Sequence, residues 1–388
     1  MQCRVSGRAR LLACELLVVG AGPYALSTAA LARERGIETT VIGSPMEFWR
    51  ENMPDGMFLR SGPDWHLDAS HVHTLGAYLE EHGIARAAVD PIPIRVFLEY
   101  CEWFQRTKHV NVRDERVTAL SKTDGGFQAT LAGGDRIVAR AVVCAPGIRH
   151  YAQLPDWAFS VPPGRADHTC ELVRFDHLAG SRVLIVGGRQ SAYEWAALLR
   201  EHGVVRIDIV HRHAVPKFER VSWRFVDAHV ENTISTPGYW RGLPPSSQAA
   251  VARQFWEVGR LTLEHWLLPR LDWDCLHRWP GTEAVETTAS PTELAVVLSN
   301  SQRLLVDHIV FATGYRADLS RVPYLAGLME QLDLTNGFPV LDEAFQTNLA
   351  GLYVTGFSAT NDFGPFFGFV KGCPAAATLI VRDILARH

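Results

Sequence analysis

Two apolar runs that each end in a glycine turn predict two strand–turn–helix units in this chain. Residues 16–19 read Leu-Leu-Val-Val and lead into Gly20, Gly22 and Ala25, after which residues 26–33 have helical apolar spacing. Residues 182–186 form a second such run, which leads into Gly187 and then into another helical pattern. The period of the apolar positions changes from strand-like to helix-like at each glycine.

The residues of these turns are suited to a bound dinucleotide. An early glycine lets the strand turn sharply, a second lets the backbone approach a diphosphate, and a small third residue lets helix and strand pack closely. The diphosphate then lies at the helix N-terminus. In the second turn Gly187 and Ala192 fit this pattern, but Arg189 stands at the middle glycine position. Two turns predict FAD and the nicotinamide coenzyme that reduces it, whereas the alternative for each is a joint without a ligand.

The strand that follows each turn indicates which nucleotide it holds. Residues 205–210 form an apolar strand that ends near Arg212, and an arginine there suits the 2′-phosphate of NADPH better than the bare ribose of NADH. The alternative for Arg212 is a solvated basic turn. Residues 39–42 end at Gly43 and Ser44, without the carboxylate expected for a ribose, although Ser44 could donate a weaker hydrogen bond.

The order of the patterns predicts an α/β fold with two nested Rossmann-like dinucleotide-binding domains. A β-meander is expected at 116–143 and a second at 293–311, and the apolar strand at 351–356 is expected to return to the first domain. The predicted domains are 1–177 and 313–388 for FAD, and 178–312 for NADPH. The NADPH domain carries a helical, aromatic-rich insertion at 218–280, with helices at 246–259 and 261–268.

The insertion has two interpretations. It either forms a small core of its own or serves as a lid over a substrate cleft, because sites prefer domain interfaces. Its aromatic helices are also a possible homodimer face.

Composition excludes several classes of function. The 388 residues have a net charge of −4, so no broad basic surface for nucleic acid is expected, and no stretch is long and apolar enough to span a membrane. Residues 1–10 are read as a short leader of a cytoplasmic protein. The seven cysteines contain no C-x-x-C pair, which argues against the usual thiol–disulfide pair and against a metal site.

Beyond the turns, further motifs resemble those of the single-component FAD- and NADPH-dependent monooxygenases. This superfamily includes flavin-containing monooxygenases, Baeyer–Villiger enzymes and lysine/ornithine N-hydroxylases. The similar segments are 20–27, 48–50, 53–61, 312–315 and 364–368, and FAD-dependent urate hydroxylase-like proteins share this branch. A linker signature is kept only in part, at Gly164 and His168, which argues against a Baeyer–Villiger or flavin-containing monooxygenase assignment. As an alternative, His168 satisfies backbone groups at the joint between the domains.

The resemblance implies a monooxygenase that uses NADPH and O2, through a C4a-(hydro)peroxyflavin, to hydroxylate a small molecule at nitrogen or at an activated ring. One alternative is an FAD-dependent oxidase, dehydrogenase or NADPH–flavin reductase without oxygen insertion. Another is a redox-responsive protein that binds both dinucleotides without turnover.

The site residues implied by the motifs fall into two groups. Candidate catalytic residues near the flavin are Arg60, His66, Asp68 and Asn361, although for each one taken singly a structural role such as turn capping or ion pairing is favoured over catalysis. The residues expected to bind the cofactors are Gly20, Gly22, Pro23, Tyr24, Ala25, Gly43, Ser44, Trp49, Met57, Arg60, Ser61, Val117, Gly147, Gly187, Arg189, Gln190, Ser191, Arg212, Gly314, Gly356, Pro365, Phe366 and Gly368.

Overall fold

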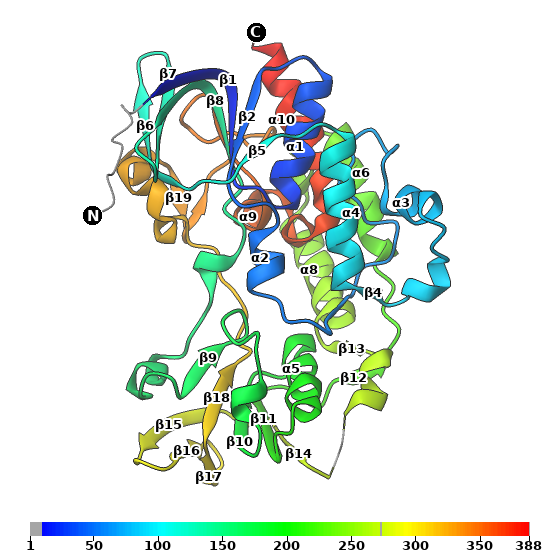
Figure 1. Cartoon of the computed structure of the whole chain (residues 1–388), viewed down its shortest axis with the longest axis vertical. Helices are drawn as coiled ribbons and strands as arrows, with labels where there is room; N and C mark the ends of the chain where they lie inside the picture. The colour runs from blue at the N-terminus through cyan, green and yellow to red at the C-terminus, as the bar shows by residue number, and fades with distance from the viewer. Residues whose placement is uncertain (1–9, 272–273, 388) are drawn as a thin grey trace, which may run out of the picture.

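The first glycine turn joins a central strand of a seven-stranded sheet to a helix (Figure 1). The computed structural model describes residues 10–271 and 274–387, so the expected leader lies outside the described residues except for its last position. The sheet has the order β5-β2-β1-β8-β7-β6, and β21 also pairs with β8. Its strands are β1 (Leu11–Val19), β2 (Thr39–Ile42), β5 (Val112–Arg113), β6 (Val117–Thr123), β7 (Gly126–Leu131), β8 (Arg136–Cys144) and β21 (Leu352–Val354).

Strand β21 brings the C-terminal part of the chain back to the first sheet. It pairs in parallel with β8, as the sequence predicts. The meander at 116–143 is also present, because β6, β7 and β8 pair antiparallel in turn. The domain boundaries at 177/178 and 312/313 stay predictions.

A second sheet lies at the other end of the molecule and follows the same plan (Figure 1). Its order is β14-β11-β10-β18-β9 and all its pairings are parallel. Its elements are β9 (Ala166–His168), β10 (Arg182–Val186), α5 (Gln190–Glu201), β11 (Arg206–His211), β14 (Leu276–Pro280) and β18 (His308–Phe311). A separate three-stranded antiparallel sheet accompanies this parallel sheet. It is made of β15 (Ala284–Ala289), β16 (Leu294–Leu298) and β17 (Arg303–Val306).

The expected strand at 303–311 is two strands. It breaks at Asp307, where the chain leaves its antiparallel pairing with β16 and begins a parallel pairing with β10. The Asp307 carboxylate accepts hydrogen bonds from the backbone N–H of Arg182, at 2.8 Å, and from its guanidinium. This pairing fixes the start of β10 against the end of β17.

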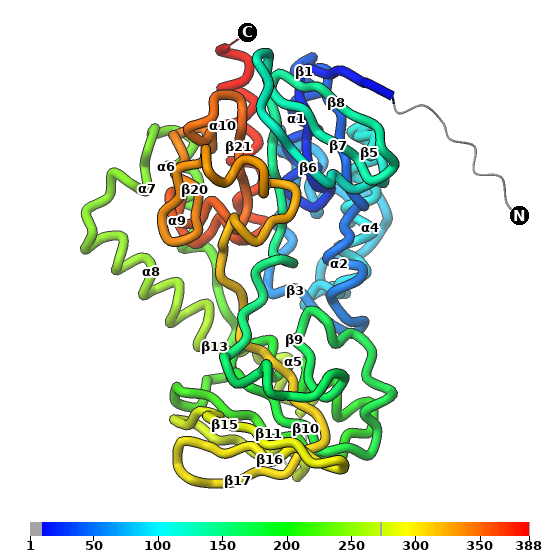
Figure 2. Tube along the Cα trace, turned by 90° about the vertical axis from the view of Figure 1, so that its left-hand side faces the viewer, coloured from blue at the N-terminus to red at the C-terminus, as the bar shows by residue number. Residues whose placement is uncertain are grey.

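The helical insertion packs on the first sheet's core rather than around one of its own. Its helices are α6 (Asp227–Ser235), α7 (Tyr239–Gly242) and α8 (Pro245–Gly259). Their apolar side chains, including Val230, Trp240 and Phe255, are buried in the same cluster as β1 and α10 (Cys373–Ala386). Figure 2 shows α6 and α7 beside α9 (Thr360–Phe363) and α10. The expectation of a separate small core is therefore wrong.

The helix expected at 261–268 is also wrong. The segment forms a short strand, β13 (Thr262–Glu264), and then a 3-10 helix over His265–Arg270 that contains Pro269. Strand β13 pairs in parallel with β12 (Lys217–Glu219), and its Leu263 is buried in the core of the second sheet. The apolar spacing is real, but it belongs to a strand and a 3-10 turn that face that core.

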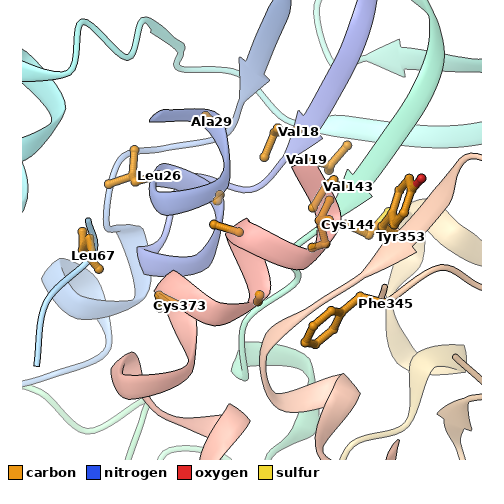
Figure 3. Close-up of a cluster of buried hydrophobic side chains, with 14 of the residues drawn as sticks. Val18, Val19, Leu26, Ala29, Leu67, Val143, Cys144, Phe345, Tyr353 and Cys373 are labelled. Carbon is orange, nitrogen blue, oxygen red and sulfur yellow. The ribbon is translucent and has the colours of Figure 1, made fainter. Parts of the chain in front are cut away.

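Small side chains bring the first and last helices together. Helix α1 (Pro23–Glu34) buries Ala25 and Ala29, and α10 buries Ala375, Ala376 and Ala377. The close-up in Figure 3 shows this helix pair against β1 and β8, where Val18 and Val143 face it. The other elements of this half are α2 (Glu47–Glu51), β3 (Phe58–Leu59), α3 (Leu75–Glu81), β4 (Ile92–Pro93), α4 (Ile94–Thr107), β19 (Leu334–Thr335) and β20 (Phe338–Pro339).

The two glycine turns are built in the same way. Gly20 has a φ of +113°, and a Cβ there would lie 2.5 Å from the Ala145 carbonyl oxygen. Gly187 has a φ of +130°, and its Cβ would lie 2.3 Å from the Ala312 carbonyl oxygen. In each turn the glycine therefore allows a close approach to the residue that follows the neighbouring strand.

We expect Gly20→Ala to lower the free energy of unfolding by roughly 1–3 kcal/mol or more, because it adds backbone strain and a clash with a carbonyl. Gly22→Ala is the matched control, since Gly22 has a φ of −84° and its Cβ would meet nothing within 4 Å. Urea unfolding of the two variants and the parent protein measures this difference. Equal loss of stability in both variants would contradict the explanation.

Candidate functional site

A single cavity of about 890 Å³ connects the two glycine turns. Gly20 and Gly22 line it from the first half, and Gly187 and Arg189 line it from the second. Helix α1 begins at Pro23 and α5 begins at Gln190, so the N-terminal backbone of both helices opens on this space. Free N–H groups at two helix starts can hold two diphosphates.

Most of the residues expected to bind cofactors line this cavity. They are Gly20, Gly22, Pro23, Tyr24, Gly43, Ser44, Trp49, Met57, Arg60, Ser61, Gly147, Gly187, Arg189, Gln190, Ser191, Arg212, Gly314, Gly356 and Gly368. These residues come from distant parts of the sequence, and the fold brings them together.

Four expected binding residues lie outside the cavity lining. Ala25 is buried within α1, and Val117 pairs with Leu131 in the meander. Pro365 starts a 3-10 helix, and Phe366 stacks on His229 with ring centroids 5.6 Å apart. Ala25, Val117 and Phe366 therefore contact other parts of the chain, and cofactor binding by all four residues stays a prediction.

Three of the four candidate catalytic residues also lie away from the cavity lining. The His66 ring contacts His71 at 3.2 Å, and burial, with His71, lowers its pKa to about 4. Asn361 is exposed and donates to Asp362. Each side chain is therefore engaged outside the cavity lining, and a catalytic role for His66 and Asn361 stays a prediction.

Asp68, the third of these, anchors a loop. Its carboxylate pairs with Lys108 at 2.8 Å and accepts from the backbone N–H of His73 at 2.7 Å and of Ser70 at 3.1 Å. Burial alone would raise the pKa of Asp68, but these hydrogen bonds outweigh it and hold the pKa at about 2. These contacts give Asp68 a structural role, and its catalytic role stays a prediction.

Arg60 is the candidate that does line the cavity, and it also links the two halves. Its guanidinium donates to the backbone oxygens of Gly259 and Thr262, and its Nε lies 3.2 Å from the Glu264 carboxylate. The Glu264 backbone N–H in turn donates to Gln190 at the start of α5. Burial lowers the pKa of Arg60, although the Glu264 charge acts in the opposite direction.

Glu194 is a cavity residue that the sequence did not single out. It lies one turn into α5, is buried, and accepts from the Phe58 backbone N–H at 3.2 Å. Burial raises its pKa to about 7. A carboxyl group that gains or loses a proton near neutral pH therefore lies beside the cavity. In the sequence, only the position of Glu194 on the helix after the second turn could have indicated it. Its hydrogen-bond donor, the Phe58 backbone N–H, belongs to the other half of the molecule.

In the second turn, Gly188 packs against the His211 ring. A Cβ on Gly188 would lie 2.3 Å from the His211 ring, so this glycine makes room for the imidazole. Burial lowers the pKa of His211 to about 4, and its ring stacks on His213 at 4.3 Å. A neutral His211 therefore supports the turn at neutral pH.

Arg189, which stands at the middle glycine position, points its guanidinium at the insertion. Its Cζ lies 3.8 Å from the Trp256 ring centroid, and burial, with Arg260 and Arg212 nearby, lowers its pKa to about 10. The exposed Arg212 lies on the cavity wall beyond the end of β11, where the sequence predicts it. Together they make this part of the cavity strongly basic.

The first turn has acidic neighbours that the sequence analysis missed. The Ser44 hydroxyl donates to the Asp114 carboxylate, and Glu47 lines the cavity three residues further along. Glu47 is paired with Arg116 and Arg149. The acidic group that seemed absent after β2 therefore comes from the loop after β5 and from α2.

His168 satisfies the backbone at the joint between the two sheets. It is buried, and its Nε2 lies 3.2 Å from the Gly314 carbonyl oxygen. Burial lowers its pKa to about 4. The structure thus agrees with the interpretation in which His168 satisfies backbone groups at the joint between the domains.

Within residues 10–271 and 274–387, no helix is long and apolar enough to cross a membrane. The same residues contain no group of three or more His, Cys, Asp or Glu side chains that could hold a metal ion.

Asp68 contributes a measurable share of stability against acid. Because its pKa is lower in the folded chain than its ordinary value near 4, its contribution is present above about pH 4 and is lost as the pH falls towards about 2. We expect Asp68→Asn to cost on the order of 2 kcal/mol at neutral pH and to flatten that part of the stability–pH curve. The exposed Asp64→Asn is the control. Thermal unfolding between pH 2 and pH 7 measures both variants, and an unchanged acid dependence in Asp68→Asn would contradict this role.

Comparisons with known proteins agree with this geometry. The model of the pyridine nucleotide-disulphide oxidoreductase family matches residues 17–236, more than half of the chain. An FAD-dependent urate hydroxylase of Xanthomonas campestris pv. campestris is 32% identical over 35% of this chain and 31% of that protein. Indole-3-pyruvate monooxygenase YUCCA1 of Oryza sativa subsp. japonica is 28% identical over 52% of this chain and 49% of that protein. The chain thus spans about a third to a half of the length of these curated relatives.

Solved structures show the same fold over nearly the whole chain. The ornithine N-hydroxylase of Kutzneria sp. 744 superposes with a TM-score of 0.82 at 17% sequence identity, covering 97% of this chain and 99% of that one. This likeness confirms the predicted α/β fold. The relatives also confirm the resemblance inferred from the motifs. This chain belongs to the pyridine nucleotide-disulphide oxidoreductase family.

Proposed function

We propose that this protein is an FAD- and NADPH-dependent monooxygenase that hydroxylates a small molecule. The observation that carries the proposal is one cavity onto which both glycine turns open. The curated relatives include a urate hydroxylase and an indole-3-pyruvate monooxygenase, and the structural relatives include ornithine hydroxylases. The outer segments 1–177 and 313–388 would hold FAD, and 178–312 would hold NADPH.

The residues present fit both dinucleotides. Gly22 at the first turn leaves open space for a close approach, since its Cβ would meet nothing within 4 Å. At the cavity wall after β21, the buried Thr355 hydroxyl has no hydrogen-bond partner among the residues that the structure describes. At the second turn, Arg189 and Arg212 supply positive charge for phosphates. Gly20, Gly22, Ser44 and Gly356 would hold FAD, and Gly187, Gln190, Ser191 and Arg212 would hold NADPH.

The bound cofactors supply hydride transfer and activation of O2, and the chain supplies orientation and a dry site. Trp65, Trp223 and Phe369 line the cavity beside Arg60, where they exclude water. Arg60 fixes the loop at 57–61 to β13. Glu194, with its pKa of about 7, can hold or release a proton at its carboxylate oxygen beside Phe58.

Other features support a reducing compartment. The described cysteines Cys14, Cys101, Cys144, Cys170, Cys275 and Cys373 are all free of disulfides. Free, mostly buried thiols are typical of cytoplasmic proteins. A homodimer through 246–268 stays a prediction, although Trp256 and Leu268 in that segment are exposed.

The proposal is tested with purified protein reconstituted with FAD. We expect a yellow holoprotein whose visible flavin band is bleached by NADPH. Incubation with isotopically labelled O2 and urate, indole-3-pyruvate or L-ornithine should then place the label in a product. Bleaching with H2O2 as the sole oxygen product for all three compounds would favour an oxidase or reductase. Absence of bleaching would favour a binding protein without turnover.

We expect Arg212→Gln to raise the KM for NADPH roughly tenfold and to leave the KM for NADH unchanged, because a 2′-phosphate would lose a charge-assisted hydrogen bond. Steady-state oxidation of both coenzymes by the FAD holoprotein measures this. Arg253→Ala on the outer face of α8 is the control, because Arg253 is exposed and does not line the cavity. An equal change for NADPH and NADH would show that Arg212 does not select the phosphate.

A further inference from the structure

We propose that the substrate is a planar aromatic molecule that carries a carboxylate or a comparably acidic group, and that Arg260 binds this anion. The inference rests on the proposed function and names the substrate class of the same cavity. It is carried by a juxtaposition at the inner wall of the insertion, where a cation that has no ion-pair partner among the described residues lies against a group of aromatic rings.

The aromatic rings come from three separate segments of the chain. Trp65, Trp223 and Phe369 line the cavity, and Phe255 packs behind them. The Trp223 ring centroid lies 6.0 Å from that of Trp65, 5.8 Å from Phe369 and 5.5 Å from Phe255. We call these four residues the aromatic wall. Gly259 is needed here, since its Cβ would lie 2.2 Å from the Trp223 ring. Flat rings at such spacings favour a flat ligand over a flexible aliphatic chain.

Arg260 is the cation of this site. It ends α8 directly after Gly259, is half-buried and lines the cavity. Its guanidinium lies 5.8 Å from the Phe255 ring centroid and 6.0 Å from that of Phe369. Among residues 10–271 and 274–387, no carboxylate forms an ion pair with it. Burial and the neighbouring Arg60 charge lower its pKa. A desolvated cation of this kind is stabilised by an anionic ligand.

The other charged groups nearby are already engaged. The Arg60 charge is balanced by Glu264, at 3.2 Å. Glu194 is partly protonated at neutral pH because burial raises its pKa to about 7. Arg189 faces Trp256 on the other side and adds a further positive charge. The net charge around Arg260 is therefore positive, which attracts an anion and repels a protonated amine.

An unpartnered donor completes the site. The Trp223 indole Nε1–H is buried and has no hydrogen-bond acceptor among the described residues, although Trp223 lines the cavity. An indole N–H can only donate. This part of the cavity wall therefore offers a donor and no acceptor for an aliphatic ammonium. A planar, acidic molecule suits the aromatic wall and the cation together.

The experiment compares four probes that differ in charge and shape. Indole-3-acetate, indole-3-acetamide and tryptamine share one ring and are anionic, neutral and cationic in turn, and L-ornithine has no ring. Binding to the FAD holoprotein is followed by calorimetry and by the change in the flavin spectrum. We expect indole-3-acetate to bind at least tenfold more tightly than indole-3-acetamide, and tryptamine and L-ornithine to bind more weakly than either.

Variants of Arg260 test whether this residue causes the tighter binding of the anionic probe. We expect Arg260→Ala to weaken indole-3-acetate binding roughly 10- to 100-fold and to change indole-3-acetamide binding little. Arg260→Lys should restore part of the loss, because it keeps the charge without the planar fork. Arg253→Ala, seven residues earlier on the exposed face of α8, should bind as the parent protein does.

Two results would overturn the proposal. One is tryptamine or L-ornithine binding as tightly as indole-3-acetate. The other is Arg260→Ala weakening NADP⁺ binding while leaving indole-3-acetate unchanged, which would assign Arg260 to a coenzyme phosphate. In both cases uptake of FAD and bleaching by NADPH would leave the proposed function standing. Failure to take up FAD would overturn the proposed function, and this inference with it.

Discussion

The close contact between a turn glycine and the end of a neighbouring strand is the constraint on which the rest of this molecule depends. Gly20 meets Ala145 and Gly187 meets Ala312 through the same backbone geometry. The Gly20 N–H donates to Ile42 and the Gly187 N–H donates to Val210, so each turn is held against the adjacent strand as well. This repeated arrangement points the start of α1 and the start of α5 at one cavity. Every residue placed around that cavity takes its position from these two turns.

The insertion connects the two repeated halves. Its helices complete the core of the first half, while β13 and the 3-10 helix after it complete the core of the second. Arg60 joins it to the loop at 57–61, and Arg189 joins it to the second turn. The insertion therefore forms a wall shared by both halves, which explains why it carries the aromatic rings and the cation of the inferred substrate site.

Local patterns made the fold largely predictable, and the site only in part. The glycine turns, the meanders and the returning strand are set by sequence-local signals, namely apolar period and turn residues. The strand break at Asp307 and the course of the chain at 262–270 depend on partners from distant segments, so periodicity could not reveal them. The contacts of Asp68 are a similar case, since Lys108, which pairs with it, comes from a distant segment. Arg260 and Glu194 look like ordinary helix-surface residues in the sequence, and only packing shows their burial.

The return of β21 and α10 to the first sheet has a consequence for how the chain assembles. Helix α1 is synthesised before every strand of the second sheet, whereas its neighbour α10 is synthesised after all of them. All strands of the second sheet lie between Ala166 and Phe311, so that lobe is complete before the first lobe has its final strand. Domains generally fold as units during synthesis, and contacts between distant segments form slowly. The second lobe can therefore acquire its structure on the ribosome before β21 and α10 have been synthesised, whereas the first lobe cannot be completed until then.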